Sequence, residues 1–335
     1  MAAVKQNITI EDVARAAGVS RQTVSRAINN KGEISPATQQ RVLDAVQRLG
    51  YQPSRVAQGL ATKRTFTIGF IISDITNPFF PNVARGVQDA ARPAGYSVLF
   101  ANSDEAKNEE LRTLQTMSAQ GVDGIVLFPH PYQYPEFTKF IEQFRPMVLI
   151  NSRFNYTNVG HITTDNYGGA RQVVDYLVGK GHTQIGMLNG LSGIDQPGQR
   201  LRGFLDGLQN HGLPANPNLI LSGAPTLEQG YQAALRLLAE QPQITAIFAY
   251  NDLMAVSAIQ ACQTLGRRVP DDCAVIGFDD TRLASLVTPP LTTVRIDQYQ
   301  LGQKATERLL AMIENPEAAF SPLNLPVELI VRESA

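Results

Sequence analysis

Five polar side chains fall on one face of residues 21–29 when that segment is placed on a helical wheel of about 100° per residue. They are Arg21, Gln22, Ser25, Arg26 and Asn29, and none of them is a carboxylate. An arginine can pair bidentately with guanine and a glutamine with adenine, while a serine can bond phosphate oxygens. This face therefore carries side chains suited to reading base edges in double-stranded DNA.

The sequence around this face predicts three short helices. Thr9 would cap the first helix and Gly18 would end it, Ser20 would cap the second, and Ser35-Pro36 would start the third. The third helix is expected to close a small core with Val42, Leu43, Val46 and Leu49. Two short helices joined by a tight glycine turn predict a helix-turn-helix whose second helix enters a major groove. The alternative is a three-helix bundle with a solvated polar face.

Charge is distributed unevenly along the chain. Residues 1–65 hold ten Lys and Arg against four acids, a balance of +6, although the whole chain carries only −1. Neutralisation of phosphates supplies much of the affinity of proteins for nucleic acids. The basic first segment therefore favours a DNA partner over the alternative of a solvated basic tail.

Several classes of protein are excluded by what the sequence lacks. The start is too polar for a signal peptide, and no apolar run could span a bilayer, so we expect a cytoplasmic protein without a membrane partner. Cys262 and Cys273 are the only cysteines and the four histidines are scattered, which predicts neither a disulfide framework nor a metal site. A G-x-S-x-G elbow, a dinucleotide fingerprint and a P-loop are all missing. We therefore expect no catalytic residues, no cofactor and no enzyme.

From residue 66 onward, short apolar runs alternate with helical stretches. FTIGFIIS, SVLFANS, GIVLFP, PMVLINS, IGMLNG, AIFAYN and CAVIGFDD each read as a buried strand. Such alternation predicts a doubly wound parallel α/β architecture. In such sheets, ligands bind outside the carboxyl ends of the strands.

Polar side chains cluster where these runs end. They include Asp74, Asn77, Asn151, Arg153, Asn251 and Asp279. Phe79 and Phe80 lie in the first such loop, and Arg200 stands near the start of a later helix. Aromatic faces, carboxylates, amides and a guanidinium together suit a sugar. Each residue also has a simpler interpretation: helix capping for Asp or Asn, core packing for the phenylalanines, and an ion pair for Arg200.

The chain resembles the lac-repressor/gal-repressor (LacI/GalR) family of bacterial transcription regulators. The motifs that carry the resemblance are ITIEDVARAAGVSRQTVSRAINNKGEIS, RVLDAVQRLGYQPSRVAQGL, DITNPFF, ITTDNYGGARQ, YNDLMAVSAIQ, VIGFDD and PPLTTVRID, in that order. It implies DNA contacts at Thr9, Ser20, Arg21, Gln22, Thr23, Ser25, Arg26 and Asn29. It also implies a core like that of periplasmic sugar-binding proteins, with Asn77, Phe79, Phe80, Asn151, Gln196, Arg200, Asn251 and Asp279 around the ligand. Two positions depart from the family: Pro225 replaces a frequent aromatic residue, and Asn151 replaces a frequent Asp.

The resemblance also sets the expected organisation. A helix-turn-helix head would occupy residues 1–50, a hinge helix 51–65, and the effector-binding and dimerisation domain 66–335. Two doubly wound subdomains would divide the latter, one formed by about 66–162 and 291–320, the other by about 163–290 and 321–333. Three strands would cross between them near 162, 290 and 321.

Residues 54–65, SRVAQGLATKRT, form a short segment with an interior glycine and an apolar Leu60. A helix this short is unstable in water by itself. The resemblance implies a hinge helix that folds on DNA, with Arg55 near phosphates, Ala57 packed against a second copy, and Leu60 wedged into the minor groove. A solvated linker is the alternative.

We therefore expect a sequence-specific regulator of carbohydrate-utilisation genes, a repressor by resemblance alone, that binds a palindromic operator as a homodimer. A dimer is expected because the sequence ends at ELIVRESA, without the leucine-rich tail of tetrameric relatives. The effector is expected to be sugar-like and to act allosterically. The alternatives are a nucleobase or nucleoside effector, or a periplasmic-type sugar-binding protein without DNA function. Whether the effector releases DNA or promotes binding stays open.

Overall fold

The computed structural model divides the chain into two compact units, Met1–Phe66 and Thr67–Ala335. The structure describes residues 8–28, 34–51, 64–104, 106–129, 134–144, 146–152, 156, 159–191 and 195–335, without the side chains of residues 195–197. The first unit is referred to below as the head and the second as the body, and each is described by itself.

The head contains the three predicted helices, α1 (Ile10–Ala17), α2 (Arg21–Ile28) and α3 (Pro36–Leu49). Thr9 and Asp12 form a reciprocal capping box at α1, and Gly18 ends that helix with a left-handed φ of 66°. The Ser35 hydroxyl caps α3 by accepting from the amide of Thr38 at 3.2 Å. The helix-turn-helix arrangement is thus set by local chemistry at the helix ends.

The core of the head differs from prediction at one position. Val13, Val24 and Val42 are fully buried, but Leu43, expected in this core, is 40% exposed. A one-residue step turns a helix by about 100°, so Leu43 points away when Val42 points inward. Ala45, which is buried, contributes to the core instead.

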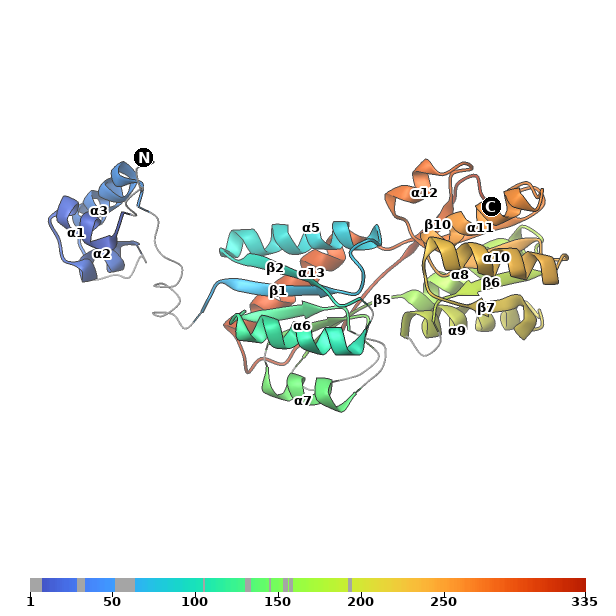
Figure 1. The fold of residues 1–335 in the computed structure, drawn as a ribbon, viewed down its shortest axis with the longest axis horizontal. Helices are drawn as coiled ribbons and strands as arrows, with labels where there is room; N and C mark the ends of the chain where they lie inside the picture. Colours follow the sequence, from blue (N-terminus) through green and yellow to red (C-terminus); the bar gives the residue numbers. More distant parts are fainter. Residues whose placement is uncertain are drawn as a thin grey trace, which may run out of the picture. The chain divides into compact units, whose positions relative to one another are not determined.

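The body contains two six-stranded sheets, so the predicted doubly wound α/β architecture is confirmed (Figure 1). The first sheet has the order β11 (Leu323–Leu325), β5 (Gly160–Thr164), β4 (Met147–Ile150), β3 (Gly124–Leu127), β1 (Thr67–Ile72) and β2 (Ser97–Asn102). The second has the order β12 (Glu328–Ile330), β10 (Thr292–Arg295), β9 (Ala274–Asp279), β8 (Ala246–Ala249), β6 (Ile185–Asn189) and β7 (Ile220–Ser222). The strand pairs are parallel, except that β12 runs antiparallel to β10.

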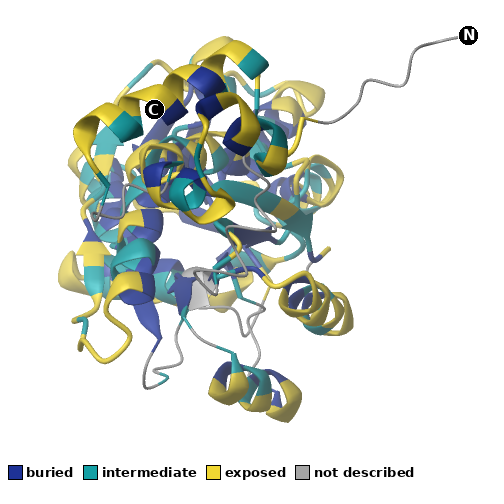
Figure 2. Ribbon diagram, turned by 90° about the vertical axis from the view of Figure 1, so that its left-hand side faces the viewer, coloured by how far each residue is buried: buried dark blue, intermediate teal, exposed yellow. Residues whose placement is uncertain are grey.

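Helices cover both faces of each sheet. Around the first sheet lie α5 (Phe79–Ala91), α6 (Lys107–Ala119), α7 (Pro135–Gln143) and α13 (Gln298–Glu314), with the 3₁₀ turn Arg92–Ala94 after α5. Around the second lie α8 (Asn166–Gly179), α9 (Asp195–Asn210), α10 (Leu227–Glu240), α11 (Asp252–Thr264) and α12 (Arg282–Leu286), with the 3₁₀ turn Pro217–Leu219. Figure 2 shows the result: the outer faces of the helices are exposed, while buried residues lie toward the sheets. These apolar interfaces place the carboxyl ends of the strands, and hence their polar residues, in fixed positions.

The chain passes between the two sheets three times. The passages follow β5, which ends at Thr164, β10, which ends at Arg295, and β11, which ends at Leu325. Each lies a few residues later than the positions 162, 290 and 321 expected from the sequence. The largest shift arises because residues 292–295, expected in the first subdomain, pair with β9 of the second sheet.

Candidate nucleic-acid interface and effector site

Helix α2 exposes the side chains expected to contact DNA. Arg21, Gln22 and Arg26 are exposed, while Val24 and Ala27 on the opposite side are buried. Ser25 is half-buried. The arrangement leaves two guanidinium groups and one amide on the outer face of this helix, which can donate to guanine and adenine edges.

The other expected contacts of the head take part in helix caps. The Ser20 hydroxyl accepts from the Thr23 amide at 3.1 Å and lies 2.9 Å from the Thr23 hydroxyl. The Thr9 hydroxyl donates to Asp12 at 2.7 Å. These three residues therefore hold the ends of α1 and α2. Contacts with DNA at the same positions stay a prediction.

Sequence reasoning missed a carboxylate beside the predicted recognition face. The carboxylate of Glu11, from α1, lies 3.4 Å from the guanidinium of Arg21, and both side chains are exposed. A wheel of one helix cannot reveal this pair, because Glu11 belongs to another helix. An exposed ion pair contributes little to stability, but this one restricts where the Arg21 guanidinium points.

We predict that Glu11→Ala changes base preference more than overall affinity. Without the carboxylate, Arg21 can reach several phosphates or bases, while one negative charge is removed from the surface that is expected to face DNA. Selection of binding sites from a random duplex pool should show weaker preference at one position of each half-site, with equal or tighter binding to unrelated DNA. Asp12→Ala is the matched control, because it removes a neighbouring carboxylate that bonds Thr9 and pairs with Arg15 but does not contact Arg21. Identical selected sequences for Glu11→Ala and the unaltered protein would contradict the prediction.

Several expected site residues lie outside the part of the chain that the structure describes. They are Asn29 in the head, Arg55, Ala57 and Leu60 in the hinge segment, Arg153 in the body, and the side chain of Gln196. Their roles stay predictions.

In the body, Arg200 lies at the centre of a buried polar network. This residue is 3% exposed, its Nε donates to the Asn166 side-chain oxygen at 2.8 Å, and its terminal nitrogens contact the Tyr250 carbonyl and the Asp279 carboxylate. The guanidinium also lies 3.6 Å from the centre of the Phe278 ring. A buried guanidinium with a carboxylate and an aromatic face is well held in one orientation. Asn166, the residue after the ITTD strand end, was not among the expected site residues.

Two buried carboxyl groups lie at the ends of this network. Burial raises the pKa of Asp279 to about 6, although Arg200 opposes the shift. Burial and the nearby Asp279 raise the pKa of Asp252 to about 8, against the hydrogen bonds from Thr293 and Thr281. Asp252 accepts from the Thr281 amide at 2.6 Å and from the Thr293 hydroxyl at 2.6 Å. Through these bonds, Asp252 connects the start of α11 to Thr281, which follows β9, and to Thr293 of β10.

These shifts predict how the stability of the body depends on pH. Both carboxyls bind protons more tightly in the folded chain than in the unfolded one, where their pKa is near 3.8. The stability they contribute is therefore present below about pH 4 and is lost as pH rises through 6 and then 8. We expect the free energy of unfolding to fall by a few kcal/mol, to order of magnitude, between pH 5.5 and 8.5. Urea unfolding followed by circular dichroism measures this, and Asp252→Asn should flatten the upper part of the curve. A free energy that rises over this range would contradict the assignment.

The expected ligand residues of the first sheet serve local structure. Asp74 accepts from the Thr76 amide at 2.8 Å, and the Asn77 side chain accepts from the Phe79 amide at 3.0 Å at the start of α5. Phe79 and Phe80 are buried, and both rings pack edge-on against Phe128. Asp74 and Asn77 thus bond backbone amides two residues further on, and the two phenylalanines pack in the core. Ligand contacts at these four positions stay a prediction.

Asn151 and Asn251 each hold backbone in place. Asn151 adopts a left-handed φ of 55°, and its side-chain oxygen accepts from the Thr164 amide at 2.8 Å. Asn251 caps α11 by accepting from the Met254 amide at 2.9 Å and donates to the Pro225 carbonyl at 3.4 Å. Tyr250, next to Asn251, supplies the carbonyl bound by Arg200, so Arg200, Asn251 and Asp279 share one edge of the second sheet.

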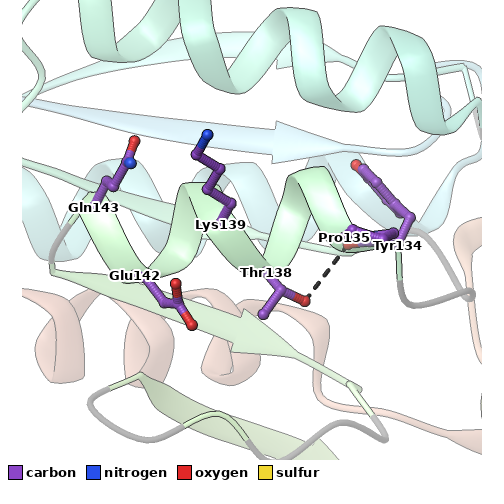
Figure 3. Close-up of a pocket in the computed structure, with 6 residues that line it drawn as sticks. All are labelled: Tyr134, Pro135, Thr138, Lys139, Glu142 and Gln143. Carbon is purple, nitrogen blue, oxygen red and sulfur yellow. Dashed lines mark hydrogen bonds between the residues drawn. The ribbon is translucent and has the colours of Figure 1, made fainter.

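A surface pocket of about 710 Å³ lies elsewhere, along α7. Tyr134, Pro135, Thr138, Lys139, Glu142 and Gln143 line it (Figure 3), and none of them was expected in a site. Among the residues that the structure describes, no cluster of His, Cys, Asp or Glu could hold a metal ion. None of the helices described is both long and apolar enough to cross a bilayer.

Comparison with known proteins decides the family. Residues 9–54 match the family described as bacterial regulatory proteins, lacI family, and residues 174–335 match the periplasmic binding protein-like domain. Catabolite control protein A of Priestia megaterium is 36% identical over 332 residues, which cover 98% of this chain and 99% of that protein. The chain belongs to the LacI/GalR family. The predicted family is thus confirmed, and this LacI/GalR protein is a DNA-binding transcriptional repressor.

Other LacI/GalR relatives cover nearly the whole chain. The ribose operon repressor of Halalkalibacterium halodurans is 36% identical over 327 residues, 97% of this chain and 96% of that protein. A structure of the lac repressor dimer bound to operator and an anti-inducer is similar with a TM-score of 0.87 and 29% identity, over 98% of this chain and 99% of that one. The structure of a complex of the regulator CelR with cellobiose is similar with a TM-score of 0.74 and 31% identity, over 98% of this chain and 100% of that one. The α2 surface therefore belongs to a DNA-binding head, and the two sheets to a periplasmic-binding-protein-like core.

Proposed function

We propose that this protein binds a palindromic operator as a homodimer and that a small sugar-like effector controls its affinity for DNA. The observation that carries the proposal is that one chain contains two features: an exposed α2 face with Arg21, Gln22 and Arg26, and a buried polar network around Arg200 and Asp279. The first suits base edges. The second suits a polyhydroxylated ligand, because hydrogen bonds to its hydroxyl groups can replace those that the side chains of the network now make with one another.

A sugar is favoured over other effectors by the chemistry of that network. A carboxylate, amides and a guanidinium can each bond hydroxyl groups, and the relatives include a ribose operon repressor and a regulator bound to cellobiose. The remaining proposed contacts are Asp74, Asn77, Phe79, Phe80, Asn151, Arg153, Gln196 and Asn251. A relative named as the repressor PurR supports keeping nucleobases and nucleosides as a second arm of any screen.

Exposed apolar side chains around α11 support a dimer. Leu286 at the end of α12 is 75% exposed, and Leu227 at the start of α10 is also exposed. The Leu227 carbonyl accepts from Ser257 of α11 at 2.7 Å, and α12 also packs on α11, so both leucines border that helix. A second copy that covers them would remove apolar surface from water. Two heads held together would place two α2 helices in successive major grooves.

The hinge segment completes the proposed mechanism. Residues 51–65 would fold only when operator DNA holds two copies together, with Arg55 near phosphates, Ala57 at the contact between copies, and Leu60 between base pairs of the minor groove. Effector binding would then bias this folding, and by linkage DNA would alter effector affinity by the same factor. Such a protein acts in the cytoplasm and needs neither a cofactor nor an enzymatic activity.

Selection of binding sites tests the DNA half of the proposal. The full chain is incubated at low salt with duplexes that contain about 20 randomised base pairs, enough for two half-sites one helical turn apart. We expect a pseudo-palindrome to emerge. Gln22→Ala should lose about 1–3 kcal/mol of discrimination at one position per half-site, whereas Gln40→Ala, on α3, should not. Failure of the unaltered protein to bind any duplex would overturn the proposal.

A thermal-shift screen tests the effector half. Mono- and disaccharides form one arm, and nucleobases and nucleosides form the other. A stabilising sugar should also change the affinity for the selected operator. Stabilisation by a nucleobase and by no sugar would contradict a sugar effector, but it would leave the proposed role in transcription regulation intact.

A further inference from the structure

Gln298 connects the two sheets of the body through both ends of one amide group. This first residue of α13 is 4% exposed. Its Nε2 donates to the backbone carbonyl of Asp279 at 2.7 Å, and its Oε1 accepts from the side-chain nitrogen of Asn82 at 3.0 Å. Asp279 ends β9 of the second sheet, whereas Asn82 lies on α5 of the first. Both functions of this buried amide are satisfied, and its partner Asn82 is 216 positions away along the chain.

On the side of the second sheet, the amide meets a residue under constraint. Asp279 has a positive φ of 110°, a conformation that side-chain-bearing residues rarely adopt. Its carboxylate contacts Arg200 at 3.4 Å, while its carbonyl contacts Gln298. A change at the carboxylate that rotates this backbone must therefore move or break the bond to Gln298.

On the side of the first sheet, the amide meets a rigid helix pair. Helices α5 and α13 approach so closely that a side chain at Gly86 would overlap the carbonyl of Tyr299, and one at Gly302 would overlap the carbonyl of Val83. The phenol of Tyr299 also contacts Asp89 of α5 at 3.3 Å. Backbones packed this tightly move together, so a displacement of Gln298 is carried to Asn82 and α5.

We propose that Gln298 is the positioning residue that couples the Arg200–Asp279 network to α5, and through α5 to the DNA affinity of the head. This inference rests on the proposed function, because it requires that the state of this network alter operator binding. Gln298 does not contact DNA. It holds the carbonyl of Asp279 against α5, so the network and the first sheet change state together. The physical link between the network and α5 is the series of contacts from Arg200 to Asp279, from Asp279 to Gln298, and from Gln298 to Asn82.

A double-mutant cycle on the full chain tests the coupling without an identified ligand. Asp279→Asn changes the network from inside and is combined with Gln298→Glu, which can still accept from Asn82 but cannot donate to the Asp279 carbonyl. The readout is affinity for the selected operator. Asp279→Asn is expected to change it about fivefold or more in the unaltered background, and less than about twofold once Gln298 is replaced. Asn82→Leu, which breaks the other bond of the amide, should suppress the effect equally.

Gln300→Glu is the matched control, because Gln300 is exposed on the same helix; the effect of Asp279→Asn should persist in that background. Urea unfolding and circular dichroism of each variant establish that it is folded, and Gln298→Met replaces Gln298→Glu if the latter is not. Operator binding with no response to Asp279→Asn, or an equal response with and without Gln298, overturns this inference alone. If the unaltered protein binds no operator, the proposed function is overturned instead.

Discussion

The Arg200→Met variant is expected to lose about 3–5 kcal/mol of unfolding free energy at pH 8, because it leaves the buried carboxylate of Asp279 without its cation. It also removes the donor to the Asn166 side-chain oxygen and the guanidinium that stacks on Phe278. Arg200 lowers the pKa of Asp279, so that pKa rises further in the variant. Protonation then relieves the unpaired charge in acid, and the loss should be smaller at pH 5.5. Urea unfolding followed by circular dichroism is suitable, since the chain has no tryptophan.

Arg202→Met is the matched control. Arg202 lies on the same helix, α9, but its side chain is exposed and pairs at 3.6 Å with a half-buried Asp206, so little change is expected. The double variant Arg200→Met/Asp279→Asn should recover part of the lost stability, because no unpaired carboxylate remains. An Arg200→Met protein as stable as the unaltered one at pH 8 would show that the network does not hold Asp279.

The Gly86→Ala variant is expected to lose about 3 kcal/mol or more, since overpacking against backbone cannot be relieved by a side-chain rotation. The added methyl group would overlap the carbonyl of Tyr299, so α5 and α13 must separate. The same separation lengthens the bond between Asn82 and Gln298. The midpoint of urea unfolding measures the loss.

Gly179→Ala provides the comparison. Gly179 ends α8, and a methyl group there meets no atom within 4 Å. Alanine has the higher helix propensity, so this variant should be unchanged or more stable by up to about 1 kcal/mol. Equal effects at the two positions would mean that the close approach of α5 and α13 is not required.

Local chemistry made the head predictable. The caps at Thr9, Ser20 and Ser35, and the end of α1 at Gly18, depend on residues within four positions of one another. The apolar periodicity of α2 likewise identified its buried side. The prediction that Leu43 is buried was wrong, because the apolar pattern of α3 contains more positions than a small core can bury.

In the body, the sequence predicted which residues would stand at strand ends but not which partners they would find. Asp279 and Arg200 are 79 positions apart, and they meet only because helix α9 lies beside the sheet that contains β9. Phe79 and Phe80 looked as suitable for a ligand platform as for a core, and the position of Phe128 places them in the core here.

The sequence alone therefore determined the helix-turn-helix head, its charge, the alternating α/β body and the family, because periodicity, capping and motifs are local properties. The tertiary structure decided the ion pair of Glu11 with Arg21, the burial of Arg200 against Asp279, and the bridge from Asp279 through Gln298 to Asn82. Each of these joins residues that no local pattern relates. Their proximity follows from the packing of whole helices and sheets, and packing is a property of the folded chain.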